Sequence, residues 1–268
     1  MVPSPPLTPP ISFDRVARIY DASRALPPEL QAELTVHLAS RLRGGRTLDI
    51  GAGTGRLSIP LQTEHGLDVV AADVSAGMLA EGRRRGLHRI VRADVRRLPF
   101  RTASFDRSLA THLLHLVPEW PLALEEIVRV TRSELLSVLK QERETPSLHE
   151  EYSALAKESG IDTAAPGIPE RRFAERYPPD RREPVGGFRV SEPATAVLQR
   201  LRDRLYRDQW DVPTPVHRKI LKTLRDRHRD DEVVLSASVE IGSWEIGRLA
   251  AALPRPGTAH ERGPTRPS

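Results

Sequence analysis

Hydrophobic and polar residues follow two different patterns along the chain, and the change occurs near residue 46. Before it, apolar residues recur every three or four positions within 13–25 and 30–42, which predicts two helices. After it, short apolar runs alternate with longer amphipathic segments. The runs predict strands at 46–50, 67–72, 89–93, 105–110 and 134–139, and the segments predict helices at 55–64, 75–85 and 119–131. Strands alternating with helices at this spacing form a parallel sheet covered on both faces, so we expect a doubly wound α/β core.

The second half of the chain departs from this alternation. Helical spacing recurs at 147–159, 193–209 and 215–228, and the stretch 163–187 is rich in proline, glycine and arginine. Residues 188–190 and the β-branched run at 232–246 predict two closing strands, with a late antiparallel strand in an otherwise mostly parallel sheet. We expect one domain over 11–253, with its core at 11–141 and a helical cap and closing strands at 142–253. Polar, proline-rich flexible tails are expected at 1–10 and 254–268.

The amino-acid composition excludes several kinds of functional site. The 268 residues include no cysteine, which excludes disulfides, thiolate metal sites and a cysteine nucleophile. Basic residues number 41 and acidic residues 36, but the two signs interleave, and only 4% of residues are aromatic, so nothing in the sequence supports an RNA-binding surface. No apolar run approaches the roughly 18–20 residues of a membrane span, and the first ten residues lack the features of a secretory signal. We therefore expect a cytoplasmic protein.

Three glycines follow the first predicted strand, in the run LDIGAGTGR. Gly51, Gly53 and Gly55 allow a sharp turn and a close approach of bare backbone to a ligand. Their G-x-G-x-G spacing lacks one spacer residue of the G-x-G-x-x-G loop that binds a dinucleotide pyrophosphate. Asp49, two residues ahead, would repel a pyrophosphate but suits an ammonium group. The loop therefore favours a ligand with an amino-acid part.

Two further aspartates follow the next two predicted strands. Asp73, eighteen residues beyond Gly55, is placed to accept both hydroxyls of a ribose, a geometry shared by nicotinamide and S-adenosylmethionine binders. The alternative is a turn or helix-capping aspartate, with Ser75 also able to cap the helix that follows. Asp94 can accept a hydrogen bond from the N6 amine of adenine, with Ala93 and Val95 flanking the ring. Three consecutive strand ends would thus hold three parts of one adenosine-containing ligand.

The runs LDIGAGTGRLSIPL, AADVSAGMLAEGR, ADVRRLPF and SFDRSLATHLLHLVPEWPLALEEIVRV resemble the class I S-adenosylmethionine-dependent methyltransferases. The resemblance covers about residues 11–140 and is strongest to the UbiE-like branch, methyltransferase type 11, which acts on small molecules. It implies a Rossmann-like fold, S-adenosylmethionine as the cofactor and a small-molecule methyl acceptor.

The resemblance also implies a role for each matching residue. Asp49 and Gly51 would hold the methionine amino group, Gly53 and Gly55 would shape the loop, Asp73 would bind ribose, Met78 would pack near adenine, and Asp94 would meet N6. In the opening run FDRVARIYDASR, Tyr20 would cover the cofactor and Arg24 would neutralise its carboxylate. Ala52, Val74 and Thr111 complete the expected set of cofactor-binding residues.

Two histidines beyond the fourth predicted strand are candidates for proton transfer. Transfer from a sulfonium is an in-line displacement, in which the protein mainly aligns the acceptor and excludes water. If the acceptor is a phenol, an amine or an acidic carbon, His115 or His112 can take its proton. A hydrogen-bonded histidine at a strand-to-helix junction is the alternative for each. A metal site is not expected, because no third ligand stands at a matching spacing.

One run departs from the family pattern. The Pro-Gly-Gly turn usual before the fifth strand is absent, and the chain reads RVTRSEL at 129–135. A shortened connection there is expected to shift the pairing of the fifth strand and to affect the acceptor pocket more than the cofactor site. Two alternatives stay open: a catalytically silent protein of this fold that binds cofactor or RNA, and an NAD(P)-dependent oxidoreductase. The acceptor and the oligomeric state are not predicted.

Overall fold

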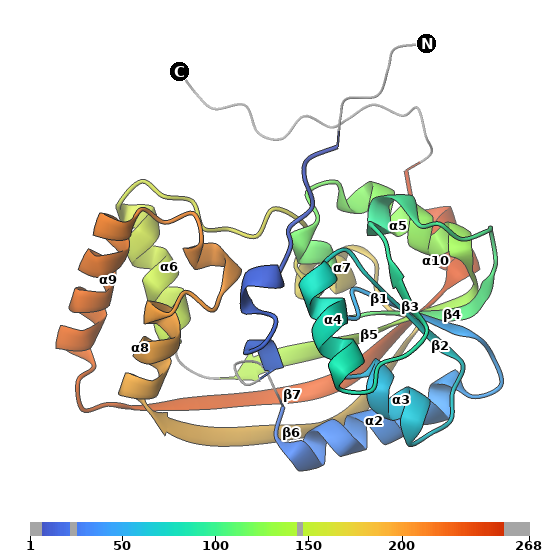
Figure 1. The fold of residues 1–268 in the computed structure, drawn as a ribbon, viewed down its shortest axis with the longest axis horizontal. Coiled ribbons are helices and arrows are strands. Elements are labelled where there is room, and N and C mark those ends of the chain that lie inside the picture. Colours follow the sequence, from blue (N-terminus) through green and yellow to red (C-terminus); the bar gives the residue numbers. More distant parts are fainter. Residues whose placement is uncertain (1–6, 22–25, 144–146, 255–268) are drawn as a thin grey trace, which may run out of the picture.

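The computed structural model describes residues 7–21, 26–143 and 147–254. Within these ranges the strands form one seven-stranded sheet in the order β3-β2-β1-β4-β5-β7-β6 (Figure 1). The strands are β1 (Thr47–Ile50), β2 (Val69–Asp73), β3 (Ile90–Arg92), β4 (Phe105–Ala110), β5 (Thr131–Arg143), β6 (Arg181–Pro193) and β7 (Glu232–Glu245). The first five are parallel, and β7 pairs antiparallel with both β5 and β6. The predicted doubly wound sheet with a late antiparallel strand is confirmed.

The helices in the described ranges agree with most of the predicted ones. They are α2 (Pro28–Leu42), α3 (Ser58–Thr63), α4 (Ala76–Arg84), α5 (Trp120–Val130), α6 (Leu148–Glu158), α7 (Glu170–Arg176), α8 (Ala194–Arg202), α9 (Thr214–Arg227) and α10 (Ile246–Ala252). Short 3-10 turns are η1 (Asp14–Val16), η2 (Val95–Arg97), η3 (Leu114–Leu116) and η4 (Arg207–Gln209). Neither α7 nor α10 was predicted from the sequence.

Two predicted helices are wrong in their extent. The helix expected at 13–25 is interrupted: the turn η1 is followed by a further turn at 17–19, and helical backbone is present again at 20–21, where this described range ends. The helix expected at 193–209 ends at Arg202, because Arg204 adopts a left-handed conformation with φ of 52°. The chain resumes as the separate turn η4. In both places the apolar spacing continues although the backbone does not stay helical.

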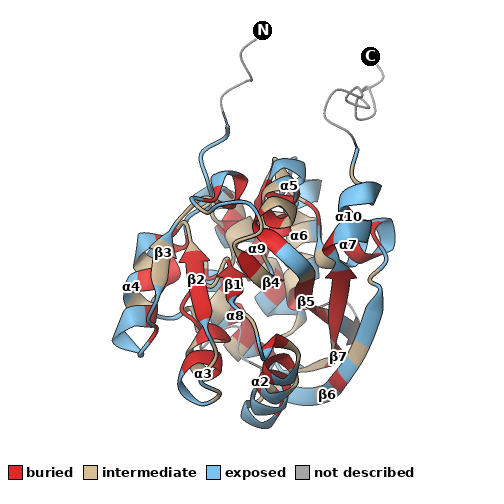
Figure 2. Ribbon diagram, turned by 90° about the vertical axis from the view of Figure 1, so that its right-hand side faces the viewer, coloured by how far each residue is buried: buried red, intermediate tan, exposed pale blue. Residues whose placement is uncertain are grey.

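Apolar side chains form a core on each face of the sheet. One core packs α5, α7 and α10 against the sheet around Leu124, Phe173 and Trp244. The other packs α2 and α3 around Leu38 and Leu61. Figure 2 shows the buried residues concentrated in the strands, while the helices turn exposed residues outward. Strands covered on both faces bury every side chain, and all four residues of β1 are buried.

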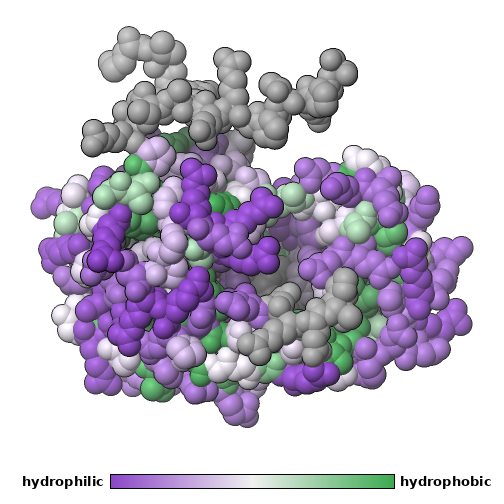
Figure 3. Space-filling view, turned by 180° about the vertical axis from the view of Figure 1, so that it is seen from behind, coloured by the Kyte–Doolittle hydropathy of each residue, from purple (hydrophilic) through white to green (hydrophobic). Residues whose placement is uncertain are grey.

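The cap consists of α6, α8 and α9, which pack together beyond the far ends of the long strands β5, β6 and β7 (Figure 1). Its own apolar cluster includes Leu148, Leu201 and Leu224. In its interior the Tyr152 hydroxyl is hydrogen-bonded to Nδ1 of His217 at 2.7 Å. His217 therefore contributes to the packing of the cap. Figure 3 shows that the face seen from behind is mainly hydrophilic, with hydrophobic side chains in small separate areas.

The missing Pro-Gly-Gly turn has a direct structural result. Helix α5 ends at Val130 and β5 begins at Thr131, with no residue between them. Phe105 pairs with Thr131 whereas Arg107 pairs with Glu134, so the pairing of β4 with β5 shifts by one residue at this point. The irregular pairing of β5 with β4 is confined to the first residues of β5.

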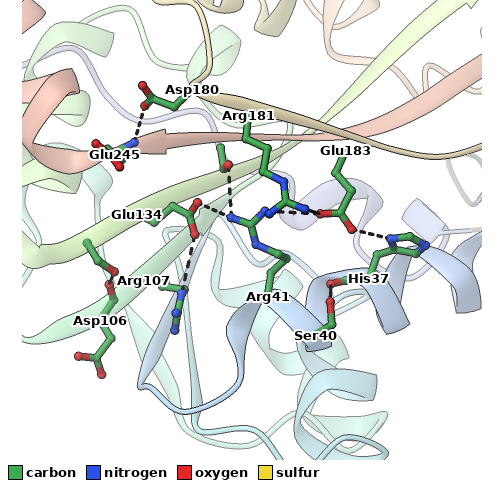
Figure 4. A network of polar contacts seen from close by, with 12 residues as sticks. His37, Ser40, Arg41, Asp106, Arg107, Glu134, Asp180, Arg181, Glu183 and Glu245 are labelled. Atoms are coloured by element: carbon green, nitrogen blue, oxygen red, sulfur yellow. Dashed lines mark hydrogen bonds and ion pairs between the residues drawn. The ribbon is translucent and has the colours of Figure 1, made fainter.

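A polar network ties α2 to the antiparallel edge of the sheet (Figure 4). Arg41 on α2 donates to Glu134 on β5 at 2.5 Å and to Glu183 on β6 at 3.4 Å. The same Glu183 carboxylate contacts His37 Nδ1 at 2.7 Å. Because these groups are partly buried, breaking one pair would leave its partner poorly solvated. The network thereby fixes α2 across strands that come late in the sequence.

The described part of the first ten residues lies on the domain. The backbone N–H of Thr8 donates to Oε1 of Glu119 at 3.0 Å, and Pro10 lines the main pocket. Residues 7–10 therefore contact the domain and do not form the predicted loose tail. Residues 1–6 and 255–268 lie outside the described residues. Among the helices of the described ranges, none has the length and apolar character needed to cross a membrane.

Candidate active site

A pocket opens at the carboxyl ends of the parallel strands, where ligands bind in sheets of this kind. It holds about 780 Å³ of space, counted to its open mouth. Ten of the residues predicted to bind a cofactor line it: Tyr20, Gly51, Gly53, Asp73, Val74, Met78, Ala93, Asp94, Val95 and Thr111. Of the others, Ala52 and Gly55 belong to the glycine loop, Asp49 precedes it at the end of β1, and Arg24 lies outside the described residues.

Two glycines of the loop could not carry a side chain, because each has a positive φ and each packs closely against a leucine. Gly51 has φ of 72°, and a Cβ there would come within 2.9 Å of the Leu113 side chain. Gly55 has φ of 80°, and a Cβ there would come within 2.9 Å of Leu87. L-residues rarely adopt such backbone angles, so side chains at these positions are opposed by both strain and contact. The loop therefore packs closely on its surroundings and exposes backbone to the pocket.

Asp73 is held in place by backbone groups on both sides. Its Oδ2 accepts from the N–H of Gly53 at 2.8 Å, and its Oδ1 accepts from the N–H of Ser75 at 2.8 Å. Ser75 itself caps α4 by accepting from the N–H of Met78. Burial raises the pKa of Asp73, and these hydrogen bonds offset only part of that effect. The carboxylate is thus fixed at the end of β2, where each oxygen retains further lone pairs for a ligand.

Asp49 lies beneath the loop. Only 3% of the residue is exposed, and its Oδ2 accepts from the Ser58 hydroxyl at 2.6 Å. Burial raises its pKa to about 6; the Ser58 hydrogen bond lowers it, and the charge of Asp73 raises it further. No arginine, lysine or histidine in the described ranges forms an ion pair with this carboxylate. A buried charge without a partner favours a cationic group at the loop above it.

Asp94 has a partner that the sequence did not reveal. Its two oxygens accept from Nε of Arg96 at 3.0 and 3.2 Å, and Oδ2 accepts from Nη2 at 2.6 Å. Nη1 of Arg96 donates to Glu119 at 2.6 Å, and only 3% of the Arg96 side chain is exposed. Burial alone would raise the pKa of Asp94, but the hydrogen bonds and charge of Arg96 outweigh it and lower that pKa. Asp94 is therefore an ionised acceptor at the pocket wall.

Residues 8–21, here called the N-terminal segment, cross the pocket. Oδ1 of Asp14 accepts from the Ser75 hydroxyl and the N–H of Gly77, both at 2.5 Å. On the other side Phe13 meets Trp210 of the cap edge-on, with ring centroids 5.0 Å apart, and the Arg15 guanidinium lies 5.0 Å from the same ring. Phe13 also lines the pocket. The N-terminal segment therefore joins the core to the cap over the site, a role that the sequence assigned only to Tyr20 and Arg24.

The two candidate histidines differ in position. His112 lines the pocket, whereas His115 is not among its lining residues. Both face Glu170, the first residue of α7: Oε1 of Glu170 is 3.1 Å from Nδ1 of His115 and 3.8 Å from Nδ1 of His112. Glu170 was missed because its segment reads as an irregular linker. Within the described ranges, acidic and histidine side chains nowhere form a group of three suited to a metal ion.

Comparisons with known proteins agree with the geometry of the pocket. A family model described as a methyltransferase domain matches residues 48–136. Demethylmenaquinone methyltransferase of Beutenbergia cavernae is 39% identical over 125 residues, which are 45% of this chain and 52% of that protein. Malonyl-[acyl-carrier protein] O-methyltransferase of Serratia marcescens is 34% identical over 122 residues, 45% of this chain and 47% of that protein. The chain thus spans about half the length of the curated relatives that it matches.

A solved structure shows the same fold. A Bacillus halodurans protein described as a methyltransferase superposes with a TM-score of 0.51 and 16% identity, covering 80% of this chain and 97% of that one. At this identity the likeness concerns the fold alone. The match of the family model, in contrast, covers the glycine loop, Asp73 and Asp94. Residues 48–136 therefore match the methyltransferase domain family, and the chain has a Rossmann-like α/β fold that it shares with the Bacillus halodurans protein.

Proposed function

We propose that this protein is an S-adenosylmethionine-dependent methyltransferase that acts on a small-molecule acceptor. The observation that carries the proposal is the buried carboxylate of Asp49 beneath a G-x-G-x-G loop, with Asp73 fixed at the end of the adjacent strand β2. This arrangement suits an ammonium and a ribose on one ligand, and it disfavours a pyrophosphate at the loop. The match over residues 48–136 supports the same ligand.

In this proposal each part of the cofactor has its own set of residues. Asp49 and Gly51 hold the amino group, Asp73 accepts from the ribose hydroxyls, and Asp94 accepts from N6 of adenine. Ala52, Gly53 and Gly55 shape the loop. The side chains assigned to the adenosine surroundings are Tyr20, Val74, Met78, Ala93, Val95 and Thr111. When bound, S-adenosylmethionine supplies a methyl group on a sulfonium, which already activates it for transfer.

The chain's own residues then have two tasks, to position the acceptor and to exclude water. The N-terminal segment supports the second task, because Pro10, Ile11 and Phe13 line the pocket from outside the sheet. The cap supports it as well, since Trp210 packs on Phe13. We therefore propose that residues 11–253 act as one functional unit, in which the cap and the core enclose a common site.

Thermal denaturation with four ligands tests the cofactor. A ligand that binds only the native state raises the melting temperature by mass action. We expect S-adenosylmethionine and S-adenosylhomocysteine to raise it, and NAD and NADP to leave it unchanged. An increase with NAD alone would make the protein an oxidoreductase and refute the proposal.

Methyl incorporation from labelled S-adenosylmethionine tests the activity. The names of the curated relatives supply the first two acceptors to be tried, demethylmenaquinone in its reduced form and malonyl-acyl carrier protein. Binding of the cofactor without methyl incorporation into either acceptor, or into a wider set of metabolites and tRNA, would indicate a protein that keeps the fold without the chemistry.

A further inference from the structure

Glu170, His112 and His115 form a cluster of titratable groups at the pocket wall, assembled from distant parts of the chain. We infer that His112 is the catalytic base, that Glu170 is the positioning residue that stabilises it when protonated, and that the acceptor therefore carries a proton that transfer must remove. The inference rests on the proposed function and narrows it to a class of acceptor, such as a phenol or a hydroquinone.

The backbone at His112 adopts a strained, left-handed conformation at the wall of the pocket. Its φ is 52°, one of four positive values among the non-glycine residues described, and it is the one of the four whose residue lines the pocket. A left-handed conformation costs an L-residue of this type about 1–2 kcal/mol. Such strain persists where the surrounding structure enforces it, and it is common at functional sites. About 43% of the His112 side chain is exposed, so the ring can be reached by an acceptor.

Glu170 is brought to this wall by a tightly docked segment. The N–H of Gly167 donates to the carbonyl of His115 at 2.9 Å, and the N–H of Ile168 donates to the carbonyl of Leu114 at 3.2 Å. A Cβ on Gly167 would lie 2.0 Å from the Leu114 oxygen, so the two backbones meet too closely for any side chain. Helix α7 begins three residues after Gly167, with Glu170 as its first residue. The position of the Glu170 carboxylate is therefore set by backbone contacts.

The surroundings of His112 shift its pKa in opposite directions. Desolvation by the pocket wall lowers the pKa of His112, the Glu170 carboxylate opposes this, and the charges of His115, Arg56 and Lys140 lower the pKa further. His112 is consequently neutral at pH 7 and free to accept a proton. Burial would raise the pKa of Glu170, but the His115 hydrogen bond and the two histidines lower it, so Glu170 is ionised when that proton arrives.

The proton balance of the step follows from these positions. With Nδ1 of His112 facing Glu170, Nε2 is the nitrogen that accepts the acceptor's proton. The oxygen or carbon of the acceptor would form a bond to the methyl carbon. The bond between the methyl carbon and sulfur would break at the same time, and its electron pair would stay on sulfur. The imidazolium that results lies 3.8 Å from Oε1 of Glu170, which stabilises it, and His115 keeps that oxygen in place at 3.1 Å. His112 then releases the proton to water.

Three variants of α7 test the inference in the full-length protein. Glu170→Gln keeps the shape and removes the charge, Glu170→Asp keeps the charge, and Glu175→Gln on the exposed side of the same helix is the matched control. In NMR titrations of ring-labelled histidine, assigned with His112→Asn, the midpoint of His112 should fall in Glu170→Gln and stay unchanged in Glu175→Gln. Asparagine is chosen because it tolerates the left-handed backbone at this position.

Turnover with two acceptors supplies the second readout. Because general base catalysis contributes about 100- to 10,000-fold, Glu170→Gln should lower kcat for a naphthohydroquinone by about tenfold or more and shift its pH profile, with KM unchanged. Glu170→Asp should restore part of the rate. Malonyl-acyl carrier protein has a free carboxylate that is already ionised at neutral pH, so none of the variants should change the rate of its methylation.

The outcomes separate this inference from the proposed function. S-adenosylhomocysteine should bind wild type and Glu170→Gln equally, so a loss of that binding would mean that Glu170 only maintains the pocket. An unchanged His112 midpoint in Glu170→Gln would overturn the inference even if the protein methylates no acceptor that is tried. A fall in the midpoint together with an unchanged kcat for the hydroquinone would also overturn it, because His112 would then not be the base.

Discussion

The buried charge of Asp49 destabilises the folded protein, and the same charge is proposed to bind the amino group of the cofactor. The substitution Asp49→Asn removes the charge and therefore tests both effects. The carboxylate lies on the central strand β1, is almost fully buried and has one hydrogen-bond donor, the Ser58 hydroxyl. Asparagine keeps the size of the side chain and can still accept from Ser58, but it carries no charge. We expect the variant to be more stable at pH 7 than the wild type and to bind the cofactor more weakly.

The size of the stability gain follows from the pKa of Asp49. Its pKa is raised from 3.8 to about 6, so the native state holds this proton more tightly than the unfolded chain does. The native protein therefore loses stability as the pH rises through this window, and above it the full cost is present, about 3 kcal/mol at pH 7. Burying the new amide group costs about 1–2 kcal/mol. The net gain is roughly 1–2 kcal/mol, or about 2–8 °C in Tm for a domain of this size.

Urea unfolding at pH 7 and pH 4 measures this gain. At pH 4 Asp49 is largely protonated in the native state, so the advantage of Asp49→Asn should shrink or vanish there. Asp226→Asn, at an exposed position of α9, is the matched control and should show no comparable pH-dependent gain. Calorimetric titration with S-adenosylhomocysteine at pH 7 should show at least about tenfold weaker binding in Asp49→Asn, because a charge-assisted hydrogen bond is lost.

Two results would refute this reasoning about Asp49. If Asp49→Asn is no more stable than wild type at pH 7, or if its advantage is the same at pH 4, burial does not raise the pKa as described. If the variant binds S-adenosylhomocysteine as tightly as wild type does, Asp49 does not hold the amino group. Each result concerns one effect, so the stability and the binding measurements are independent.

Three further predictions concern the pocket and its cover. Asp73→Ala should abolish most of the Tm increase caused by S-adenosylmethionine, and an unchanged increase would mean that the ribose lies elsewhere. Gly55→Ala should cost about 1–3 kcal/mol in urea unfolding, because φ of 80° and the contact with Leu87 both oppose a side chain. Trp210→Ala should speed hydrogen exchange in residues 8–21 while circular dichroism stays unchanged, since Phe13 loses its partner in the cap. Unchanged exchange would show that the cap does not hold the segment.

The core of the fold was predictable because its signals are local. The strands β1 and β2 are short apolar runs, and they are buried on both faces by helices whose own apolar spacing is visible in the sequence. The glycine loop and Asp73 follow the same logic, since each comes directly after a strand. Parallel strands bring such positions to one edge of the sheet, so their proximity needs no knowledge of distant contacts.

The missed features depend on contacts between distant residues. Glu170 meets His115 across 55 positions, and Arg96 meets Glu119 across 23, so no local pattern reports either pair. The N-terminal segment has continuous helical apolar spacing, but its backbone forms the 3-10 turn η1 and a further turn before it becomes helical at 20–21. Its Asp14 bonds to Ser75 and Gly77 on α4, and its Phe13 packs on the cap. Tertiary contacts of this kind override intrinsic preference.

In the proposed function the N-terminal segment would also set an order of events. It is fastened to the core by Asp14 and Thr8 and to the cap through Phe13, and it lies across the pocket that the cofactor would fill. Spent cofactor would then leave only after these contacts open, and fresh cofactor would enter before they close again. Motions of this kind commonly take microseconds to milliseconds and often limit turnover. We therefore expect loosening of this segment to speed cofactor exchange while exposing the methyl donor to water.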